Sequence, residues 1–428
     1  MTRAWAHPFR SLAVRNFRLF AAGQVVSVAG TWMMVTAQDW LVLELTGDSG
    51  TALGVVTAAQ FTPLLLLTLY GGRLADRYDK RVLLVLANLA SGVLALGLAV
   101  LVLCDAVRLW HIGLFALGLG VVNAVEVPTR MSFVSELVGA DLLPNASALS
   151  AAYFNVARIA GPALAGLLIT GLGGTGPVMA ANAASYLATV VGLRAMRPGE
   201  LHRPPRPAAR PRVVDGLRHV RARPDLLLPV CLVAVVGLFG LNFQLTLPLL
   251  AKTVFHADAA AFGLLTSCFA AGSLLAAFAT TARRGRPSGR QVVYSALVFG
   301  ALEAATGWAP GYAAAAALLF LTGFAALYFA QAANHRIQLG SAPEFRGRVL
   351  ALYTLILQGS TPLGALLVGA LSARLGARSG FWAGGLVSLA AGLAAWAAER
   401  RVRDGPDPDG PPPRPPDHSG TDRRAIRP

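Results

Sequence analysis

Long uninterrupted apolar blocks are the feature that most limits what this chain can fold into. Each block runs for roughly twenty residues and is apolar on all sides, the length that a helix needs to cross a bilayer. Only 14% of the 428 residues are charged, whereas a soluble domain carries about 25%. Because backbone in hydrocarbon must satisfy its own hydrogen bonds, the blocks predict an all-α membrane protein. The twelve predicted spans are 17–45, 51–72, 81–103, 109–128, 145–170, 176–195, 226–250, 260–281, 291–309, 311–333, 347–371 and 379–398.

The basic residues are distributed between the loops in a way that orients these spans. If the N-terminus is cytoplasmic, 32 of the 37 lysines and arginines fall on the cytoplasmic side. The opposite side holds only Arg108, Lys252, Arg374 and Arg378, and Arg158 lies within a span. This asymmetry predicts a multi-pass protein of the bacterial cytoplasmic membrane with both termini in the cytoplasm. The formal charge of +16 therefore indicates topology in a lipid bilayer, and no nucleic-acid partner is expected.

The spans fall into two sets of six that resemble each other. Residues 161–169 (GPALAGLLI) and 361–369 (TPLGALLVG) each carry a proline at the second position, and the two prolines are 200 residues apart. Internal repeats of this kind are typical of transporters that alternate the access of a central site. The predicted fold is thus an all-α membrane protein of twelve transmembrane helices in two pseudo-symmetric six-helix bundles. In chain order we expect a cytoplasmic N-terminus (1–16), the first bundle (17–195), a Pro/Arg-rich cytoplasmic linker (196–225), the second bundle (226–398) and a disordered cytoplasmic tail (399–428).

The loop between the second and third spans carries the most specific motif, GRLADRYDKR at 72–81. Gly72 is expected to allow close helix approach, and Asp76 to offer a carboxylate to the N-terminus of a neighbouring helix. Contacts of this kind, at the cytoplasmic face, can break and re-form between two conformations. The alternative, a topology signal only, explains the charges but not the spacing of Gly, Leu and Asp. The residues predicted to form this inner gate are Gly72, Leu74, Asp76, Arg77, Lys80 and Arg81.

This loop resembles the signature of the major facilitator superfamily, G-x-L-A-D-R-x-G-R-[KR], with Asp79 in place of the second glycine. Two further segments, NVARIAGP at 155–162 and PEFRGRV at 343–349, are similar to the drug and siderophore exporter branch, which includes enterobactin exporters. The resemblance covers residues 9–398 and implies the two-bundle fold of that superfamily.

Within the resemblance, Gly161 and Pro162 look like the antiporter motif of the fifth span, in which small residues and a proline shape a tight helix contact. That motif implies export rather than uptake. An ordinary glycine–proline packing contact is the alternative. The helix-packing residues in the two halves are Gly161, Pro162, Gly166, Pro362 and Gly364.

Arg158 needs an explanation, because a charge near the bilayer centre costs roughly 2.5–3.5 kcal/mol. It lies about 18 Å along the fifth span and is expected to face a central cavity, paired with a carboxylate or with anionic substrate. The alternative is a structural role against backbone carbonyls. The residues predicted to line the cavity are Arg158, Asn155, Gln24, Asn123 and Gln358.

Three acids are candidates for proton coupling. Asp39 lies toward the outer end of the first span, where the alternative is an interfacial residue beside Trp40. Glu303 is a buried acid of the ninth span. Glu126 precedes Arg130 by four residues, and an i,i+4 ion pair is its simpler interpretation.

The chain carries no phosphate-binding Gly-Lys-Ser/Thr loop, no His-x-x-x-His pair and no Gly-x-Ser-x-Gly elbow. We therefore expect no enzyme, no metal and no cofactor, and a proton gradient as the energy source. The predicted function is a monomeric secondary transporter that exports drug-like or siderophore-like small molecules by proton antiport. Nutrient uptake by the same fold is one alternative, and a non-transporting membrane sensor or scaffold is another.

Overall fold

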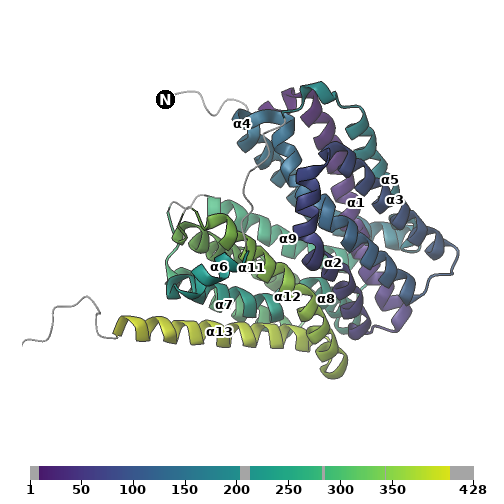
Figure 1. Ribbon diagram of the computed structural model, residues 1–428. Coiled ribbons are helices and arrows are strands. Elements are labelled where there is room, and N and C mark those ends of the chain that lie inside the picture. The colour runs from purple at the N-terminus through teal and green to yellow at the C-terminus, as the bar shows by residue number, and fades with distance from the viewer. Residues whose placement is uncertain (1–8, 203–212, 282–284, 343, 405–428) are drawn as a thin grey trace, which may run out of the picture.

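The computed structural model describes residues 9–202, 213–281, 285–342 and 344–404, which form helices joined by short turns (Figure 1). The first half contains α1 (Arg15–Thr46), α2 (Gly50–Arg77), α3 (Lys80–Leu103), α4 (Leu109–Leu172) and α5 (Gly176–Arg194). The second half contains α6 (Val213–Arg221), α7 (Pro224–Phe239), α8 (Phe243–Leu249), α9 (Ala259–Thr281), α10 (Gly289–Gly307), α11 (Tyr312–Gly340), α12 (Arg346–Leu375) and α13 (Arg378–Asp404). Shorter helical turns are η1 (Arg10–Ala13), η2 (Pro198–Glu200) and η3 (Leu250–Val254).

Ten helical segments in the described part of the chain are long and apolar enough to cross a membrane. They are α1–α5, α9, α11–α13 and one segment that runs from α7 through η3. Helix α4 has 64 residues, about 96 Å of helix, whereas hydrocarbon is about 30 Å thick. It contains one residue outside helical geometry, Gly139, with φ 72° and ψ 179°. Because glycine adopts positive φ without steric cost, α4 bends there and consists of two rods.

The sequence predicts a non-helical connection between residues 128 and 145, and this prediction is wrong. Helix α4 runs through these residues and departs from helical geometry only at Gly139. Phe133 and Leu137, one turn apart, are fully buried in a cluster with Phe17 and Phe20 of α1. The rings of Phe20 and Phe133 meet edge to face at 5.7 Å. Apolar residues at i,i+4 stabilise a helix that packs on a neighbour, so the first rod extends beyond its apolar block.

The seventh predicted span, 226–250, is interrupted. Helix α7 ends at Phe239, α8 begins at Phe243, and η3 is a five-residue π-helix. Asn242 has non-helical dihedral angles, φ −98° and ψ 34°. An interrupted helix at membrane depth leaves backbone groups for side chains or ligands to satisfy.

The predicted linker, 196–225, contains more structure than its Pro/Arg-rich composition indicates. Residues 203–212 lie outside the described residues, but η2 and α6 lie on either side. Val220 of α6 is fully buried, and the ring of His219 stacks on Phe345 at 4.4 Å. Helix α6 therefore docks onto the second half, because its short amphipathic face finds apolar partners there.

The ends of the chain also differ from the prediction. The tail predicted from 399 begins as helix, since α13 continues to Asp404, and residues 405–428 lie outside the described residues. Arg400 stacks over Trp396 at 3.6 Å, a contact within the helix that supports this extension. Residues 1–8 lie outside the described residues, and η1 precedes α1.

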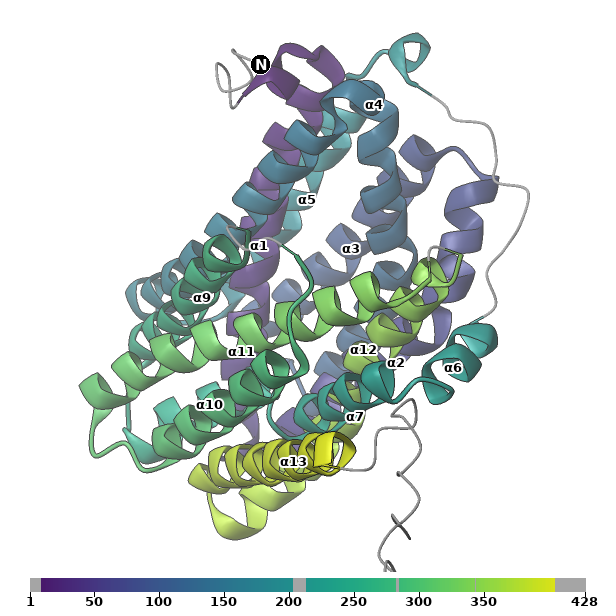
Figure 2. The ribbon, with the colours of Figure 1, turned by 90° about the vertical axis from the view of Figure 1, so that its left-hand side faces the viewer.

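The two halves meet near one end of the bundle. We call this the closed end; it carries Gly47, Gly173 and Gly376. The opposite basic end carries 72–81 and 285–290. In Figure 1 the halves approach each other around α2, α8 and α12, whereas the part of α4 that carries the label lies apart from α6. In Figure 2 most first-half helices occupy the upper part of the view and α7, α10 and α13 the lower part.

Candidate functional site

Small residues bring α4 and α9 of opposite halves into backbone contact. A Cβ on Gly166 would overlap the carbonyl of Ala259, and a Cβ on Gly263 would overlap the carbonyl of Pro162. Backbones approach this closely only where side chains are absent, so these glycines let the two halves meet without a gap.

A second contact of the same kind joins α2 to α12. A Cβ on Gly54 would overlap the carbonyl of Ala365, and a Cβ on Gly369 would lie 2.7 Å from the carbonyl of Gly50. The residues come from the closed-end parts of both helices. Together the α4–α9 and α2–α12 contacts seal this end on two sides.

The predicted packing motif also contacts helices of its own half. A Cβ on Gly161 would lie 2.6 Å from Cβ of Trp32 in α1, while one on Gly364 would overlap the carbonyl of Leu238 in α7. Pro162 and Pro362 are both buried. The fifth and eleventh predicted spans therefore pack in corresponding ways, one on α1 and one on α7.

Replacing Gly166 by leucine is expected to lower the melting temperature of the purified protein. Overpacking at a backbone contact costs about 1–3 kcal/mol, more than the about 0.8–1 kcal/mol that leucine gains over glycine in a helix. Gly171→Leu is the matched control, because a Cβ there meets nothing within 4 Å on the same helix. Differential scanning fluorimetry measures both, and equal melting temperatures would contradict the contact.

Charged and aromatic side chains lie over the closed end. Asp48, in the turn after α1, forms an ion pair of 2.8 Å with Lys252 of η3 in the other half. The ammonium of Lys252 also lies 5.2 Å from the centre of the Trp40 ring, which stacks on Phe262 of α9 at 6.1 Å. We call Asp48, Lys252, Trp40 and Phe262 the latch. The sequence prediction missed it, although Lys252 was one of only four cations assigned to that side.

Two residues of the predicted gate motif bind within the first half. Lys80 forms an ion pair with Glu136 of α4. Arg81 donates to the carbonyls of Leu193, at 2.6 Å from Nε, and Arg194, at 2.9 Å from Nη2. These bonds tie the start of α3 to α4 and α5 and do not cross to the second half.

Gly72 does not make the close contact that the sequence predicts. A Cβ on Gly72 would meet nothing within 4 Å, whereas one on Gly71 would overlap the carbonyl of Ala124 in α4. The glycine pair lies on consecutive positions, which point to different faces of a helix. The close approach of α2 and α4 therefore belongs to Gly71.

The remaining motif residues lie at the surface of the basic end. Asp76 and Arg77 are exposed, Leu74 is half-buried, and the guanidinium of Arg77 lies 5.8 Å from the Tyr78 ring. Asp79 caps α3, since its carboxylate accepts from the backbone N–H of residues 81 and 82 at 2.9 and 3.3 Å. This capping role explains an aspartate at the position of the superfamily's second glycine.

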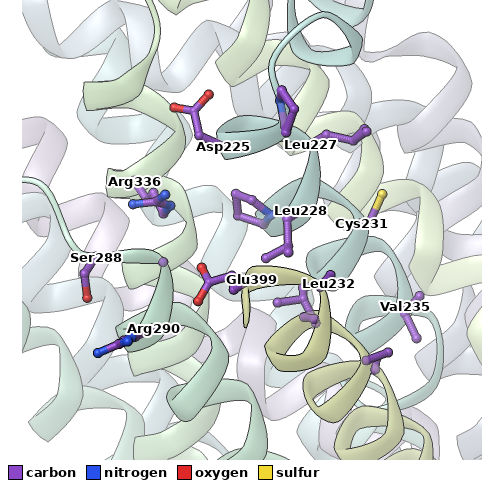
Figure 3. A pocket seen from close by; sticks show the side chains of 17 residues that line it. Asp225, Leu227, Leu228, Cys231, Leu232, Val235, Ser288, Arg290, Arg336 and Glu399 are labelled. Atoms are coloured by element: carbon purple, nitrogen blue, oxygen red, sulfur yellow. The ribbon is translucent and has the colours of Figure 1, made fainter. Parts of the chain in front are cut away.

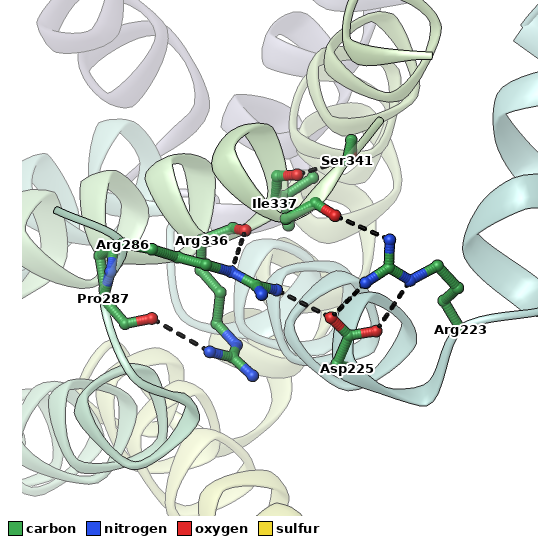
Figure 4. A network of polar contacts seen from close by, with 8 residues as sticks. Arg223, Asp225, Arg286, Pro287, Arg336, Ile337 and Ser341 are labelled. Atoms are coloured by element: carbon green, nitrogen blue, oxygen red, sulfur yellow. Dashed lines mark hydrogen bonds and ion pairs between the residues drawn. The ribbon is translucent and has the colours of Figure 1, made fainter. Parts of the chain in front are cut away.

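A second charged network occupies the basic end of the other half (Figure 4). Asp225, at the start of α7, accepts from Arg223 at 3.0 Å and from Arg286 at 2.8 Å. Arg223 also donates to the carbonyl of Gly340, at the end of α11. These bonds hold the first turn of α7 to α11 and to the loop before α10.

Arg158 lies on the face of α4 that packs on α1. Phe154 and Gly161, at i−4 and i+3, share this face, and the rings of Phe154 and Trp32 meet edge to face at 6.0 Å. The Nε and Nη2 atoms of Arg158 are buried and have no hydrogen-bond partner among the described residues. Burying these two nitrogens carries a desolvation cost that no contact among the described residues offsets.

Asp39 lies on α1, 2% exposed, and its Oδ1 has no partner in the described structure. Gln38 beside it donates to Gln60 of α2 at 3.3 Å. Asp39 is seven residues beyond Trp32, and Arg158 is three residues before Gly161, which touches Trp32. Since α1 and this rod of α4 run in the same direction, Asp39 and Arg158 are about 15 Å apart along the helices. They do not form an ion pair.

Glu303 lies at the interruption of the seventh span. Its carboxylate fits against two glycines, since Oε2 would lie 2.9 Å from a Cβ on Gly240 and Cδ would lie 2.9 Å from one on Gly384. The side chain is 3% exposed, and Oε2 has no partner within the described residues. The hydroxyl of Ser388, also buried and without a partner there, would lie 2.8 Å from the same Gly240 Cβ. Glu303 thus lies packed between Gly240, Gly384 and Ser388 at the point where α7 crosses α13, a site that we call the Glu303 chamber.

Glu126 differs from the other two acids because it is paired. Its Oε1 accepts from Nε of Arg130 at 2.9 Å, the i,i+4 ion pair of the simpler interpretation. A carboxylate bound in this way is suited to a structural role rather than to exchanging a proton.

The five predicted cavity residues are not brought together in a described cavity. Gln24 is buried, whereas Asn123, Asn155 and Gln358 are half-buried, and the Asn155 amide donates to its own helix at Ala151. Two cavities lie elsewhere. One of about 590 Å³ covers the closed end beside Asp48, and one of about 810 Å³ lies between α7, α10 and α13 at the basic end.

Comparison with known proteins identifies the fold and the family together. The family described as transmembrane secretion effectors matches residues 4–411. This chain belongs to that family, within the major facilitator superfamily. Such proteins are transporters and not enzymes, and the chain is a multi-pass membrane protein.

Relatives of this chain include proteins named as efflux pumps, exporters and transporters. It is 26% identical to the multidrug efflux pump Tap of Mycolicibacterium fortuitum, covering 88% of this chain and 93% of the pump. It is 26% identical to the enterobactin exporter EntS of Citrobacter koseri, covering 95% and 96%. The staphyloferrin A transporter of Staphylococcus aureus is 26% identical over 60% of this chain and 65% of its own length.

Solved structures support the same fold. The nucleoside transporter NupG has a TM-score of 0.73 at 11% identity, covering 90% of this chain and 99% of NupG. A bacterial homologue of the lysosomal transporter Spinster, in an inward-facing and occupied conformation, has a TM-score of 0.70 at 16% identity, covering 94% and 100%. At these identities the likeness concerns the fold alone.

Proposed function

We propose that this chain is a monomeric proton antiporter that exports small acidic molecules across the cytoplasmic membrane by alternating access. The observation that carries the proposal is a set of three ionisable side chains, Asp39, Arg158 and Glu303, each with buried polar atoms that have no partner in the described residues. They lie in a fold whose halves are sealed at the closed end. Buried unpaired charges are retained in membranes where they bind ions or substrate.

The proposal includes twelve spans in two bundles. The two rods of α4 count as two spans and α10 adds another, which brings the ten apolar segments to twelve. Excess arginine at 72–81, 194–223 and 283–290 supports an orientation with the basic end and both termini in the cytoplasm. In this orientation the two halves are sealed toward the outside, which corresponds to an inward-facing state.

Substrate and protons bind at different residues during the transport cycle. Arg158 binds an anionic group of the substrate beneath the aromatic pair Trp32 and Phe154. Glu303 and Asp39 take up protons from outside after the latch opens and release them to the cytoplasm. Corresponding crossings at Gly161 and Gly364 let the fifth and eleventh spans move against α1 and α7.

The substrate class follows from the buried cation and from the relatives. Enterobactin and staphyloferrin A appear in the names of two relatives, and a multidrug pump is a third. We infer that this chain exports a siderophore-like or drug-like molecule with at least one acidic group.

Flux in oriented vesicles tests direction and coupling. Inverted vesicles that contain the protein should accumulate an anionic siderophore when their interior is acidic, and right-side-out vesicles should not retain it. Accumulation in the opposite sense would establish uptake, and a D-xylose–proton symporter has the same fold. No flux in either orientation would favour the sensor or scaffold.

Replacing Lys252 by methionine is expected to favour the outward-open state. A half-exposed ion pair with an added cation–π contact contributes about 1 kcal/mol, so the population of that state should rise roughly fivefold. Spin labels measure the distance between the two halves at the closed end. They are attached at Leu45→Cys and Leu375→Cys, which are exposed residues of opposite halves. Arg374→Met, which removes an exposed cation at the same end, should leave the distances unchanged. Unchanged distances in Lys252→Met would contradict the latch.

A further inference from the structure

An apolar groove runs along the second half at the basic end (Figure 3). Its volume is about 810 Å³. One wall consists of leucines and Val235 of α7, and the other consists of alanines of α13. Cys231, Ala394 and Ala398 in these walls are exposed, so the groove opens to the outer surface of the bundle. At membrane depth such a surface contacts hydrocarbon and not water.

The groove exists because α7 and α13 touch at one point and then separate. A Cβ on Gly384 would lie 2.7 Å from the carbonyl of Phe239, and one on Gly240 would lie 2.8 Å from the Ser388 hydroxyl. Toward the basic end, the small alanines of α13 leave the space between the helices unfilled.

The corresponding helices of the first half are in close backbone contact. There α1 and α5 pack through Gly23, whose Cβ would lie 2.9 Å from Cα of Thr189, and through Gly192, whose Cβ would lie 2.8 Å from the carbonyl of Leu19. These contacts extend to the basic end of that half. The described contacts of the two helix pairs thus differ at the basic end, where α7 and α13 line the groove.

Polar groups lie only at the mouth of the groove, at the basic end. Asp225 is already bound by two arginines, and Glu399 lies against Gly289, at the start of α10. Arg290 is exposed and has no partner among the described residues. Arg336 donates from Nη1 to a backbone carbonyl, but its buried Nε has no partner there. The mouth thus keeps two incompletely used guanidinium groups beside an apolar wall.

We propose that the groove binds one anionic phospholipid of the cytoplasmic leaflet. The apolar walls of α7, from Pro224 to Val235, extend for about 16 Å, which suits an acyl chain lying along the helix. The phosphate lies at Arg290 and Arg336, since guanidinium groups bind phosphate oxygens in paired hydrogen bonds. The site is separate from Arg158 and from the transport route, so it goes beyond the proposed function.

Native mass spectrometry of the full-length protein tests the proposal. Protein reconstituted in vesicles of phosphatidylglycerol or of phosphatidylethanolamine is extracted into mild detergent, and the retained lipids are counted. We expect one phosphatidylglycerol on most wild-type molecules and at least fivefold less retained phosphatidylethanolamine. Ala394→Trp, which fills the groove, and Arg290→Gln should each lose the retained lipid, and Arg290→Lys should keep part of it.

Matched controls separate this site from general lipid contact. Ala90→Trp alters an exposed alanine of α3 in the first half, and Arg374→Gln removes an exposed arginine at the closed end. Both should retain phosphatidylglycerol as the wild type does. Equal retention of the two lipids, or full retention by Ala394→Trp, would overturn the proposal.

A second measurement keeps the test valid if a groove variant does not fold. In a Cys104→Ser, Cys268→Ser protein, Cys231 is the one remaining thiol, and it lines the groove. Phosphatidylglycerol should slow its reaction with a membrane-permeant maleimide severalfold relative to phosphatidylethanolamine. Equal rates would count against a lipid in the groove.

Discussion

Arg158→Met is expected to abolish export of anionic substrates and to raise the melting temperature at the same time. Arg158 is half-buried, and its buried Nε and Nη2 are unpartnered in the described structure, so removing its charge relieves a desolvation cost. Methionine fills a similar space beside Phe154 and Trp32. A charged hydrogen bond to substrate contributes about 1.5–3 kcal/mol, so affinity for an acidic substrate should fall roughly 10- to 100-fold.

Vesicle flux and scanning fluorimetry together measure this pair of effects. Arg130→Met is the matched control, because it removes an arginine of the same helix that is paired with Glu126. It should lower the melting temperature, since it leaves a buried carboxylate unpaired. If Arg158→Met instead lowered the melting temperature and left acidic-substrate export intact, Arg158 would be a structural residue.

Glu303→Gln is expected to uncouple the transporter. Glutamine has the shape of the protonated acid but cannot lose a proton, so the chamber between Gly240 and Gly384 should stay filled and neutral. Accumulation driven by a pH gradient should fall by at least about tenfold, whereas exchange of substrate across the membrane should persist. Gradient-driven uptake into inverted vesicles measures the coupled accumulation. Counterflow of labelled substrate measures the exchange that should persist.

Glu126→Gln serves as the control for this variant. Its carboxylate is bound to Arg130, so its loss should change stability more than coupling. Gradient-driven transport at the wild-type rate in Glu303→Gln would remove Glu303 from the proton pathway and leave Asp39 as the remaining candidate.

The sequence was sufficient to predict the parts of the fold that depend on apolar length. The superfamily, the all-helical membrane class and the family resemblance are confirmed by the comparisons, because signature loops and apolar blocks are local in sequence. The pair formed by Glu126 and Arg130 was predictable for the same reason, since four residues bring two side chains to one face of a helix.

Features that depend on contacts between distant helices were not predictable. Nothing local distinguishes Gly71 from Gly72, but only Gly71 faces Ala124 of α4. The chamber around Glu303 is formed by Gly240 and Gly384, which are 63 and 81 residues away in the chain. The hydropathy of 226–250 does not indicate the interruption at Asn242, because an interrupted apolar helix can have the same composition as a continuous one.

The docking of α6 has a mechanical consequence for the opening of the basic end. His202 is held to the first half through the carbonyl of Glu136, at 2.7 Å, and α6 is held to the second half through Val220 and His219. The covalent path between these anchors, from 202 to 213, spans at most about 40 Å when fully drawn out. The number of residues between these anchors therefore limits how far the two halves can separate at the basic end.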